Sequence, residues 1–372
     1  MIFVWLLSCG APEPLQETPH EATDCTLAYR SHSPQYSPAE WAHALPINRG
    51  QVVFFAEHHG QAHQLQQLSQ GIELLASKSD KLIFAAEWLP ASATEKLNTL
   101  VQNSAWNSQT WWSIISEKYF IAPLELEDYA EPLMTIQRLN QDRSEPIRIV
   151  GLAPDCHFQK LKTKTAVTDC LSDRERSMAQ QWRSAFPPRS EGMGIISAGY
   201  RHAQLIQSDK EGLKPLAMRL AEDYSVYSVL LAGREEDGRS TCKGLFDRQD
   251  QERIYPLVEL PNSALNTACL SPDPAHDIVP LSAAFTHFWI APHPWKEGQA
   301  LPLEAWSSMD PRTLQSWSKF QFELLGGMDL GPNPQTWKSA MGVQLADLDQ
   351  FVIGSFSCSE LEQISSPPAS AP

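Results

Sequence analysis

Short apolar runs alternate with amphipathic segments through the central part of the chain. Six runs are apolar at almost every position and have the length of a strand: residues 51–56, 81–86, 147–152, 193–198, 225–231 and 284–290. Runs that are apolar on both faces are typical of parallel strands covered by helices on both sides. The pattern therefore predicts an α/β fold, a doubly wound and mostly parallel sheet with helices on both faces.

The segment after the first run shows the helical periodicity most clearly. Four apolar residues recur there at helical spacing and form one stripe: Leu65, Leu68, Ile72 and Leu75. His63 falls nearly opposite this stripe, so we expect it at the surface rather than in a metal site with His59. A strand, a helix and a strand within about thirty residues fit one right-handed crossover.

The remaining segments suggest how the chain is divided. Short helices are expected at 38–44 and 214–223, and the long segments 156–185 and 233–277 are expected to be lids or helical insertions. Pro, Ser and Thr are frequent before residue 45 and after residue 365, which is typical of a tether and a disordered tail. We divide the chain into a signal (1–9), a tether (10–45), the α/β domain (46–298), a helical C-terminal extension (299–358) and a disordered tail (359–372).

The first ten residues predict export. Leu6-Leu7-Ser8-Cys9 resembles the cleavage box of a bacterial lipoprotein signal, in which the Cys receives lipid. We therefore expect a lipid-anchored or periplasmic protein of the bacterial cell envelope that contacts the membrane through this anchor alone. The six other cysteines then permit disulfides, and the pairs that we expect are Cys156–Cys170 and Cys242–Cys269.

Charge and missing motifs narrow the function classes. The formal net charge is −15 and the chain has no Lys/Arg cluster, so we do not expect a nucleic-acid partner. Gly-x-Ser-x-Gly, Walker and Gly-x-Gly-x-x-Gly motifs are absent from the sequence. The sequence therefore contains no motif that would support a serine hydrolase, a nucleotide-dependent transferase or a dehydrogenase.

Carboxylates stand where the first two expected strands end. Glu57 directly follows the first run, His59 comes two residues later, and Glu87 follows the second run. The carboxyl ends of parallel strands share one edge of the sheet, where open α/β sheets bind ligands. Two carboxylates there bind a cation or share a proton, unless Glu57 and His59 simply cap the next helix. Asp155 follows the third run, and we expect it in water.

A second polar group follows the fourth expected strand. Arg201 of Gly199-Tyr200-Arg201-His202 is able to bind a carboxylate, and His202 is able to ligate a metal or transfer protons. Tyr200 is a candidate axial ligand of haem iron, since phenolate is one of the ligands that haem proteins use. We expect His287 to be a core or edge histidine. His293, at the end of the last expected strand, is a further candidate site residue.

These residues resemble the ChaN-like haem-binding lipoprotein family, within the wider Tiki and erythromycin-esterase-like superfamily. The shared pattern is a strand leading into Glu57-x-His59, a strand that ends in Glu87, and a strand that ends in Gly-x-x-His202, over about residues 48–235. Ala56 stands where the family usually has Gly. The resemblance implies a doubly wound α/β fold, export as a lipoprotein and a pocket built on the two carboxylates and two histidines.

Three functions follow as hypotheses. The first is binding of haem or a related iron cofactor, with Tyr200, Arg201 and His202 as cofactor-binding residues. The second is a metal-dependent hydrolase, in which Glu57, His59, Glu87 and His202 hold a divalent ion such as Mn or Zn or activate its water. The third is a non-catalytic interaction scaffold. The expected partner is a small molecule or cofactor, and a homodimer stays open.

Overall fold

The computed structural model describes most of the α/β domain. The described residues are 35–46, 48–116, 127–154, 163–207, 214–234, 252–257, 281–294 and 302–308, with short pieces up to residue 336. Cys9, Asp155, the tail and most of the expected C-terminal extension lie outside them, as does the side chain of His293.

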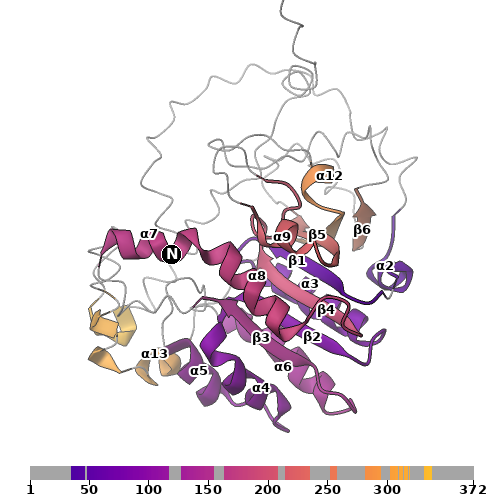
Figure 1. The fold of residues 1–372 in the computed structure, drawn as a ribbon. Helices are drawn as coiled ribbons and strands as arrows, with labels where there is room; N and C mark the ends of the chain where they lie inside the picture. The colour runs from indigo at the N-terminus through magenta and orange to yellow at the C-terminus, as the bar shows by residue number, and fades with distance from the viewer. Residues whose placement is uncertain are drawn as a thin grey trace, which may run out of the picture.

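Seven strands and two sets of helices make up the described fold (Figure 1). The strands are β1 (Gln51–Glu57), β2 (Leu82–Pro90), β3 (Arg148–Ala153), β4 (Met193–Gly199), β5 (Ser225–Arg234), β6 (Arg253–Pro256) and β7 (His287–Pro294). The longer helices are α2 (Pro38–Ala44), α3 (Ala62–Ala76), α4 (Thr94–Gln102), α5 (Ser108–Ser116), α6 (Glu131–Asn140), α7 (Lys164–Ser172) and α8 (Arg174–Ala185). The short helical elements are α9 (Leu216–Leu220), α12 (Leu281–Ala284), α13 (Leu303–Ser308), η2 (Ala91–Ala93) and η3 (Glu127–Ala130).

The described strands form one sheet in the order β3-β2-β4-β1-β5-β7-β6. Every pairing is parallel except that of β6 with β7. Crossovers that run from β1 toward β3 place their helices on one face, and crossovers that run back toward β7 place theirs on the other, as right-handed connections require. The predicted doubly wound, mostly parallel fold is confirmed.

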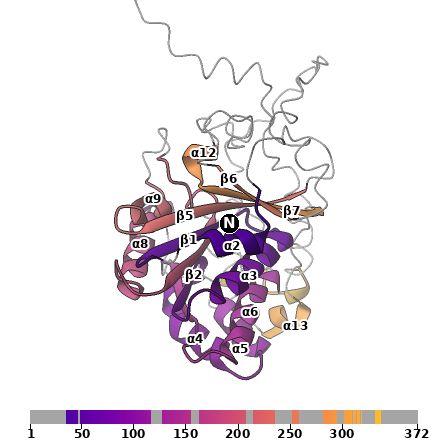
Figure 2. The ribbon, with the colours of Figure 1, turned by 90° about the vertical axis from the view of Figure 1, so that its right-hand side faces the viewer.

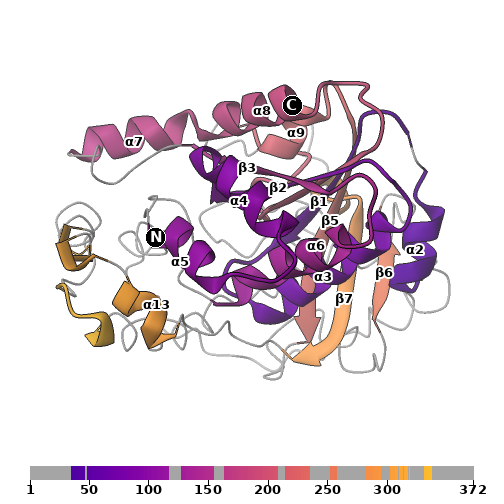
Figure 3. The same ribbon diagram turned by 90° about the horizontal axis from the view of Figure 1, so that it is seen from below.

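Helices lie on both faces of the sheet (Figure 2), and each face buries its own apolar core. Val53 and Phe55 of β1 face the core formed with α3, α4 and α6, whereas Val52 and Phe54 face the core formed with α8 and α9. This explains why the strand runs are apolar at every position. Helix α7 continues beyond the sheet from the start of α8 (Figure 3).

Helix α2 packs against the sheet, although the sequence placed residues 38–44 in the tether. The indole of Trp41 is buried, and its ring lies 6.2 Å from that of Phe55 and 6.0 Å from that of Trp289. Tyr36 forms a β-bridge with Ile254 of β6. These contacts join residues 36–45 to the α/β domain.

Three details differ from the sequence prediction. His63 was expected at the surface, and this was wrong, because it is 2% exposed: α3 packs against the sheet and against α6, so its far side is covered as well. Strand β6 lies in a segment that was expected to be a lid or a helical insertion. The last strand begins at His287, because α12 occupies residues up to Ala284.

Candidate functional site

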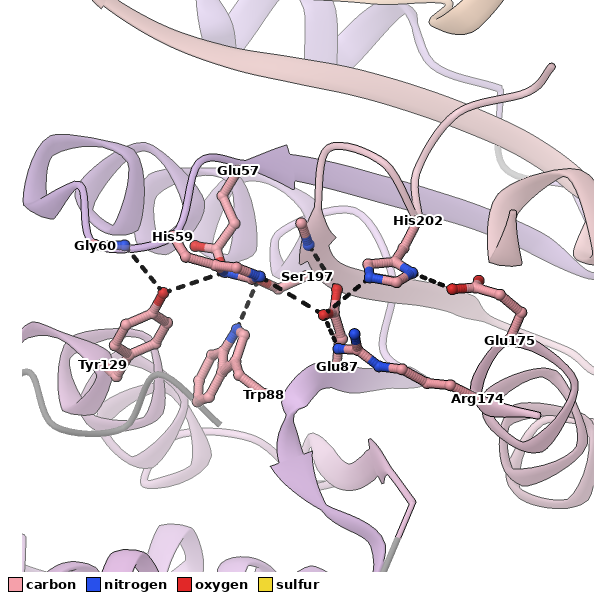
Figure 4. Close-up of polar contacts among 11 residues, drawn as sticks. Glu57, His59, Gly60, Glu87, Trp88, Tyr129, Arg174, Glu175, Ser197 and His202 are labelled. Carbon is pink, nitrogen blue, oxygen red and sulfur yellow. Dashed lines mark hydrogen bonds and ion pairs between the residues drawn. The ribbon is translucent and has the colours of Figure 1, made fainter. Parts of the chain in front are cut away.

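The carboxyl ends of β2, β4 and β1 bring the predicted site residues together (Figure 4). Glu57 lies opposite Gly199 in the pairing of β1 with β4, and Glu87 follows the last pair of β2 with β4. The turn after β4 then places His202 beside Glu87, with Nε2 at 3.2 Å from Oε1. Residues from separate crossovers therefore meet at one edge of the sheet.

His59 lies between two buried carboxylates. Its Nδ1 is 3.1 Å from Glu57 Oε1, and its Nε2 is 3.6 Å from Glu87 Oε1. Gly60 has a φ of 94°, a conformation that favours glycine and permits the tight turn from β1 to α3. The His59 side chain is 32% exposed, against 18% for His202, 2% for Glu57 and 1% for Glu87. Among these four side chains, His59 is the most accessible from solvent.

Glu87 is the centre of the network. Its Oε1 accepts a hydrogen bond from Arg174 Nη2, and its Oε2 accepts one from the Gly199 N–H at 2.7 Å. His202 and His59 both direct Nε2 toward the same Oε1. A carboxylate buried this completely is costly unless it is paired and hydrogen-bonded, and these contacts meet that requirement.

Helix α8 supplies two residues that the sequence did not identify. Arg174 and Glu175 occupy its first turn, and Glu175 Oε1 is hydrogen-bonded to His202 Nδ1. His202 therefore faces the Glu87 carboxylate through Nε2 and is held by the Glu175 carboxylate through Nδ1. The available signal was the charged run of residues 173–176 before an amphipathic helix, which is also typical of a solvated helix end.

The network keeps both histidines protonated at neutral pH. Burial lowers the pKa of His59, but hydrogen bonds to Glu57 and Glu87 outweigh it and raise the pKa to about 10. Burial likewise opposes protonation of His202, and the charges of Glu175 and Glu87 raise its pKa to about 9. Burial would raise the pKa of Glu87, yet the charges of Arg174 and His202 hold it well below its ordinary value.

These shifts predict how stability depends on pH. The histidine pKa values are raised on folding, so their contribution is complete below the ordinary value of 6.5 and is lost as pH rises through about 9 and 10. The lowered pKa of Glu87 contributes fully above 4.5 and is lost in acid. We expect the difference in free energy of unfolding between the wild type and His202→Gln, measured with urea, to be largest between these limits. A difference that is constant up to pH 10 would contradict the network.

The backbone at Gly199 leaves room for His59. A Cβ at this position would lie 2.8 Å from His59 Nε2 and 3.5 Å from Glu87 Oε2. Contacts below 3.0 Å are not tolerated without movement, so any side chain here displaces the imidazole. Glycine at the end of β4 is therefore required by the position of a site residue rather than by backbone conformation.

Tyr200 and Arg201 lie at the rim of the network. The Tyr200 ring stacks on His58, with ring centroids 4.7 Å apart and an interplanar angle of 29°. Arg201 Nε donates a hydrogen bond to the Tyr200 hydroxyl at 3.3 Å. Burial, and then the charge of His59, lower the pKa of His58 to about 4, so that His58 is neutral where His59 is charged.

The four predicted metal ligands do not fit a divalent ion. Glu87 already accepts hydrogen bonds from the Arg174 guanidinium and the Gly199 N–H, and both ring nitrogens of His202 face carboxylates, whereas a metal ligand must offer a free lone pair. Among the residues that the structure describes, no group of three or more His, Cys, Asp or Glu side chains is arranged to hold a metal ion. The arrangement is instead suited to holding and moving protons.

Comparisons with known proteins support the fold. No protein-family model and no curated protein matches the chain. A solved structure from Bacillus cereus is 11% identical and has a TM-score of 0.53, over 76% of this chain and all of the other. A mutant of the erythromycin esterase EreC in its open conformation is 12% identical, with a TM-score of 0.51 over 70% of this chain and 95% of the other.

ChaN of Campylobacter jejuni, described as binding haem cofacially, is also among the structural neighbours. It is 11% identical, with a TM-score of 0.25 over 50% of this chain and 82% of the other. The neighbours thus include both an erythromycin esterase and ChaN. At these identities EreC establishes the erythromycin-esterase-like α/β fold alone, and the ChaN likeness is too weak to support an argument.

Proposed function

We propose that the chain is a hydrolase of neutral carboxylic esters, in which His59 accepts and returns a proton and the His202 imidazolium stabilises developing negative charge. One observation carries this proposal: two histidines, each held by a carboxylate through Nδ1, direct Nε2 toward the same buried Glu87 from different elements. Positioned groups that accept a proton and donate one are what ester hydrolysis requires.

The residues account for each proton in the reaction. Deprotonated His59 removes a proton from water through Nε2 while the water oxygen bonds to the ester carbonyl carbon. The imidazolium of His202, held by Glu175 and Glu87, stabilises the negative charge that develops. Protonated His59 then returns the proton from Nε2 to the leaving alkoxide as the carbon–oxygen bond breaks. Glu57 and Glu175 hold the two rings in the required tautomers through Nδ1.

The charges in the site favour a neutral substrate. Three buried or mostly buried carboxylates, Glu57, Glu87 and Glu175, lie in this network. The positive charges of Arg174, His59 and His202 balance these three carboxylates. When His59 is deprotonated and ready to act as a base, the site carries one unit of excess negative charge. This excess negative charge would repel an anionic phosphate or sulfate ester. The fold is compatible with ester hydrolysis, since the neighbour EreC is an erythromycin esterase.

A matched substrate panel tests this function. We expect hydrolysis of p-nitrophenyl acetate and butyrate but not of p-nitrophenyl phosphate, with kcat/KM rising about tenfold per pH unit from neutrality because His59 must lose its proton, and levelling off near pH 9 because His202 must keep its own. EDTA is expected to leave the rate unchanged. Turnover of the phosphate alone, or loss of the esterase activity with EDTA and its return with Mn or Zn, would overturn the proposal.

Gly199→Ala is expected to remove most of this activity. The added methyl group would lie 2.8 Å from His59 Nε2 and displaces the imidazole, whereas Glu87 Oε2, at 3.5 Å, is at an ordinary contact distance. Gly71→Ala is the matched control: its Cβ would lie 2.4 Å from the Phe55 ring in the core, so it should lower the melting temperature and spare kcat in the folded fraction. Equal kcat in Gly199→Ala and the wild type would contradict the assigned position of the base.

Haem binding is a second candidate function, supported by Tyr200. Its phenol lies at the rim and accepts a hydrogen bond from Arg201, an arrangement suited to an iron-bound phenolate. When bound, haem would supply its own redox and ligand chemistry. His202, the other expected ligand, does not fit this role because Glu175 and Glu87 occupy both ring nitrogens.

Reconstitution with haemin tests this candidate. We expect a Soret band that is weakened in Tyr200→Phe and kept in Tyr227→Phe, a partly buried tyrosine of β5 away from the rim. His202→Gln is expected to keep the band as well. A wild-type protein with no Soret band, or a band insensitive to Tyr200→Phe, would overturn it.

We also propose that the chain is exported and anchored by lipid at Cys9. The disulfide at Cys170 supports an oxidising compartment, although its pairing stays a prediction. In the described part of the chain no helix is both long and apolar enough to cross a membrane. Metabolic labelling with a radioactive fatty acid should mark the wild type and not Cys9→Ala, and equal labelling of the two would contradict the anchor.

A further inference from the structure

We infer that Tyr129 is a positioning residue for His59, an inference that rests on the proposed hydrolase function. Tyr129 lies in η3, on the crossover from β2 to β3, and reaches the turn after β1. Its phenol oxygen accepts a hydrogen bond from the Gly60 N–H at 3.3 Å and lies 3.4 Å from His59 Nδ1 (Figure 4). It therefore contacts both the ring of the base and the turn that carries it.

Packing fixes the position of this phenol. Tyr129 is fully buried, and its ring meets Trp88 edge to face, with centroids 4.9 Å apart and an interplanar angle of 62°. Trp88 Nε1–H donates in turn to Ser197 Oγ of β4 at 3.0 Å. Because Trp88 belongs to β2, the phenol oxygen is held relative to two strands that end at the site. A positioning group must be rigid in this way to orient another side chain.

The contact selects which nitrogen of His59 reacts. The groups that face His59 are the carboxylates of Glu57 and Glu87, the phenol of Tyr129 and the neighbouring ring of His58. Glu57 and Tyr129 both lie at Nδ1, where their oxygens favour a proton on that nitrogen. Nε2 is then left as the nitrogen that exchanges a proton with water.

Tyr129→Phe tests the inference because it keeps the ring and removes the oxygen. We expect kcat for p-nitrophenyl acetate to fall about tenfold while KM is unchanged, since orientation of the base is lost and substrate contacts are not. In NMR titrations of the ligand-free protein we expect the pKa of His59 to fall by about half a unit, because an acceptor for its N–H is gone.

Tyr224→Phe is the matched control. Its hydroxyl donates to the Phe186 carbonyl in the other core, so the variant loses a buried phenol hydrogen bond away from the site. It should lose stability and keep both the His59 titration and kcat. If Tyr129→Phe behaves like Tyr224→Phe, the role is structural and the inference fails. An inactive wild type in which Tyr129→Phe still shifts the His59 titration would overturn the hydrolase function and support the coupling of the two residues.

Discussion

Replacing His59 with glutamine is expected to lower kcat for neutral esters by about a hundredfold to ten-thousandfold, the range that a general base contributes. Glutamine preserves the approximate size of the side chain and a hydrogen bond to Glu57, but its amide cannot act as a base in the fraction of molecules in which His59 would be deprotonated. Because the raised pKa of His59 also contributes to stability, kcat is compared in the folded fraction. Steady-state kinetics with p-nitrophenyl butyrate measures it.

The matched control for this substitution is His287→Gln. His287 lies on β7, away from the charged network, and its Nδ1 is hydrogen-bonded to the Thr286 hydroxyl at 2.9 Å. Its variant should keep the wild-type kcat. If His59→Gln is as active as His287→Gln, His59 is not the base and the assignment of the site to ester hydrolysis falls.

The second large effect is expected for Glu87→Gln. Removing this charge leaves Arg174 and His202 without their shared carboxylate in a buried setting, which typically costs about 3–5 kcal/mol in the free energy of unfolding. The amide keeps an acceptor but cannot balance the charges. Urea unfolding should show a lower midpoint, and the folded fraction should be inactive because both histidines lose the group that they share.

Glu191→Gln provides the comparison for Glu87→Gln. Glu191 is an exposed carboxylate that pairs with Arg49 and Lys81, and exposed pairs contribute little to stability. Its unfolding curve should overlay that of the wild type. A Glu87→Gln protein that is as stable as Glu191→Gln would show that Glu87 is not the centre of the network.

Much of the fold could be predicted from the sequence because each strand buries both faces. An apolar run such as that of β1, with Val53 in one core and Phe54 in the other, is visible without knowledge of its neighbours. The order of the strands was not predictable, because it depends on which long-range pairings form. Strand β6 was missed because its four residues are too few to show a period.

The site was partly predictable because several of its residues lie at the carboxyl ends of those strands. Glu57 ends β1, Glu87 lies in β2 just after its last pair with β4, and His202 follows β4, and parallel strands bring such positions to one edge. Arg174 and Tyr129 come from helical elements whose sequences give no sign of which way they face. Without Arg174 the carboxylates could be taken for metal ligands, whereas the structure shows Glu87 bound to its guanidinium and facing both histidines.

The central claim is that Glu57, Glu87 and Glu175 tie His59 and His202 into one proton-holding network. NMR titration of the imidazole nitrogens in the ligand-free protein tests it most directly, with assignments from His59→Gln and His202→Gln. The account predicts that both rings are still doubly protonated at pH 7.5 and titrate near 10 and 9, well above the ordinary value of 6.5. Rings that titrate independently at or below 6.5 would contradict it.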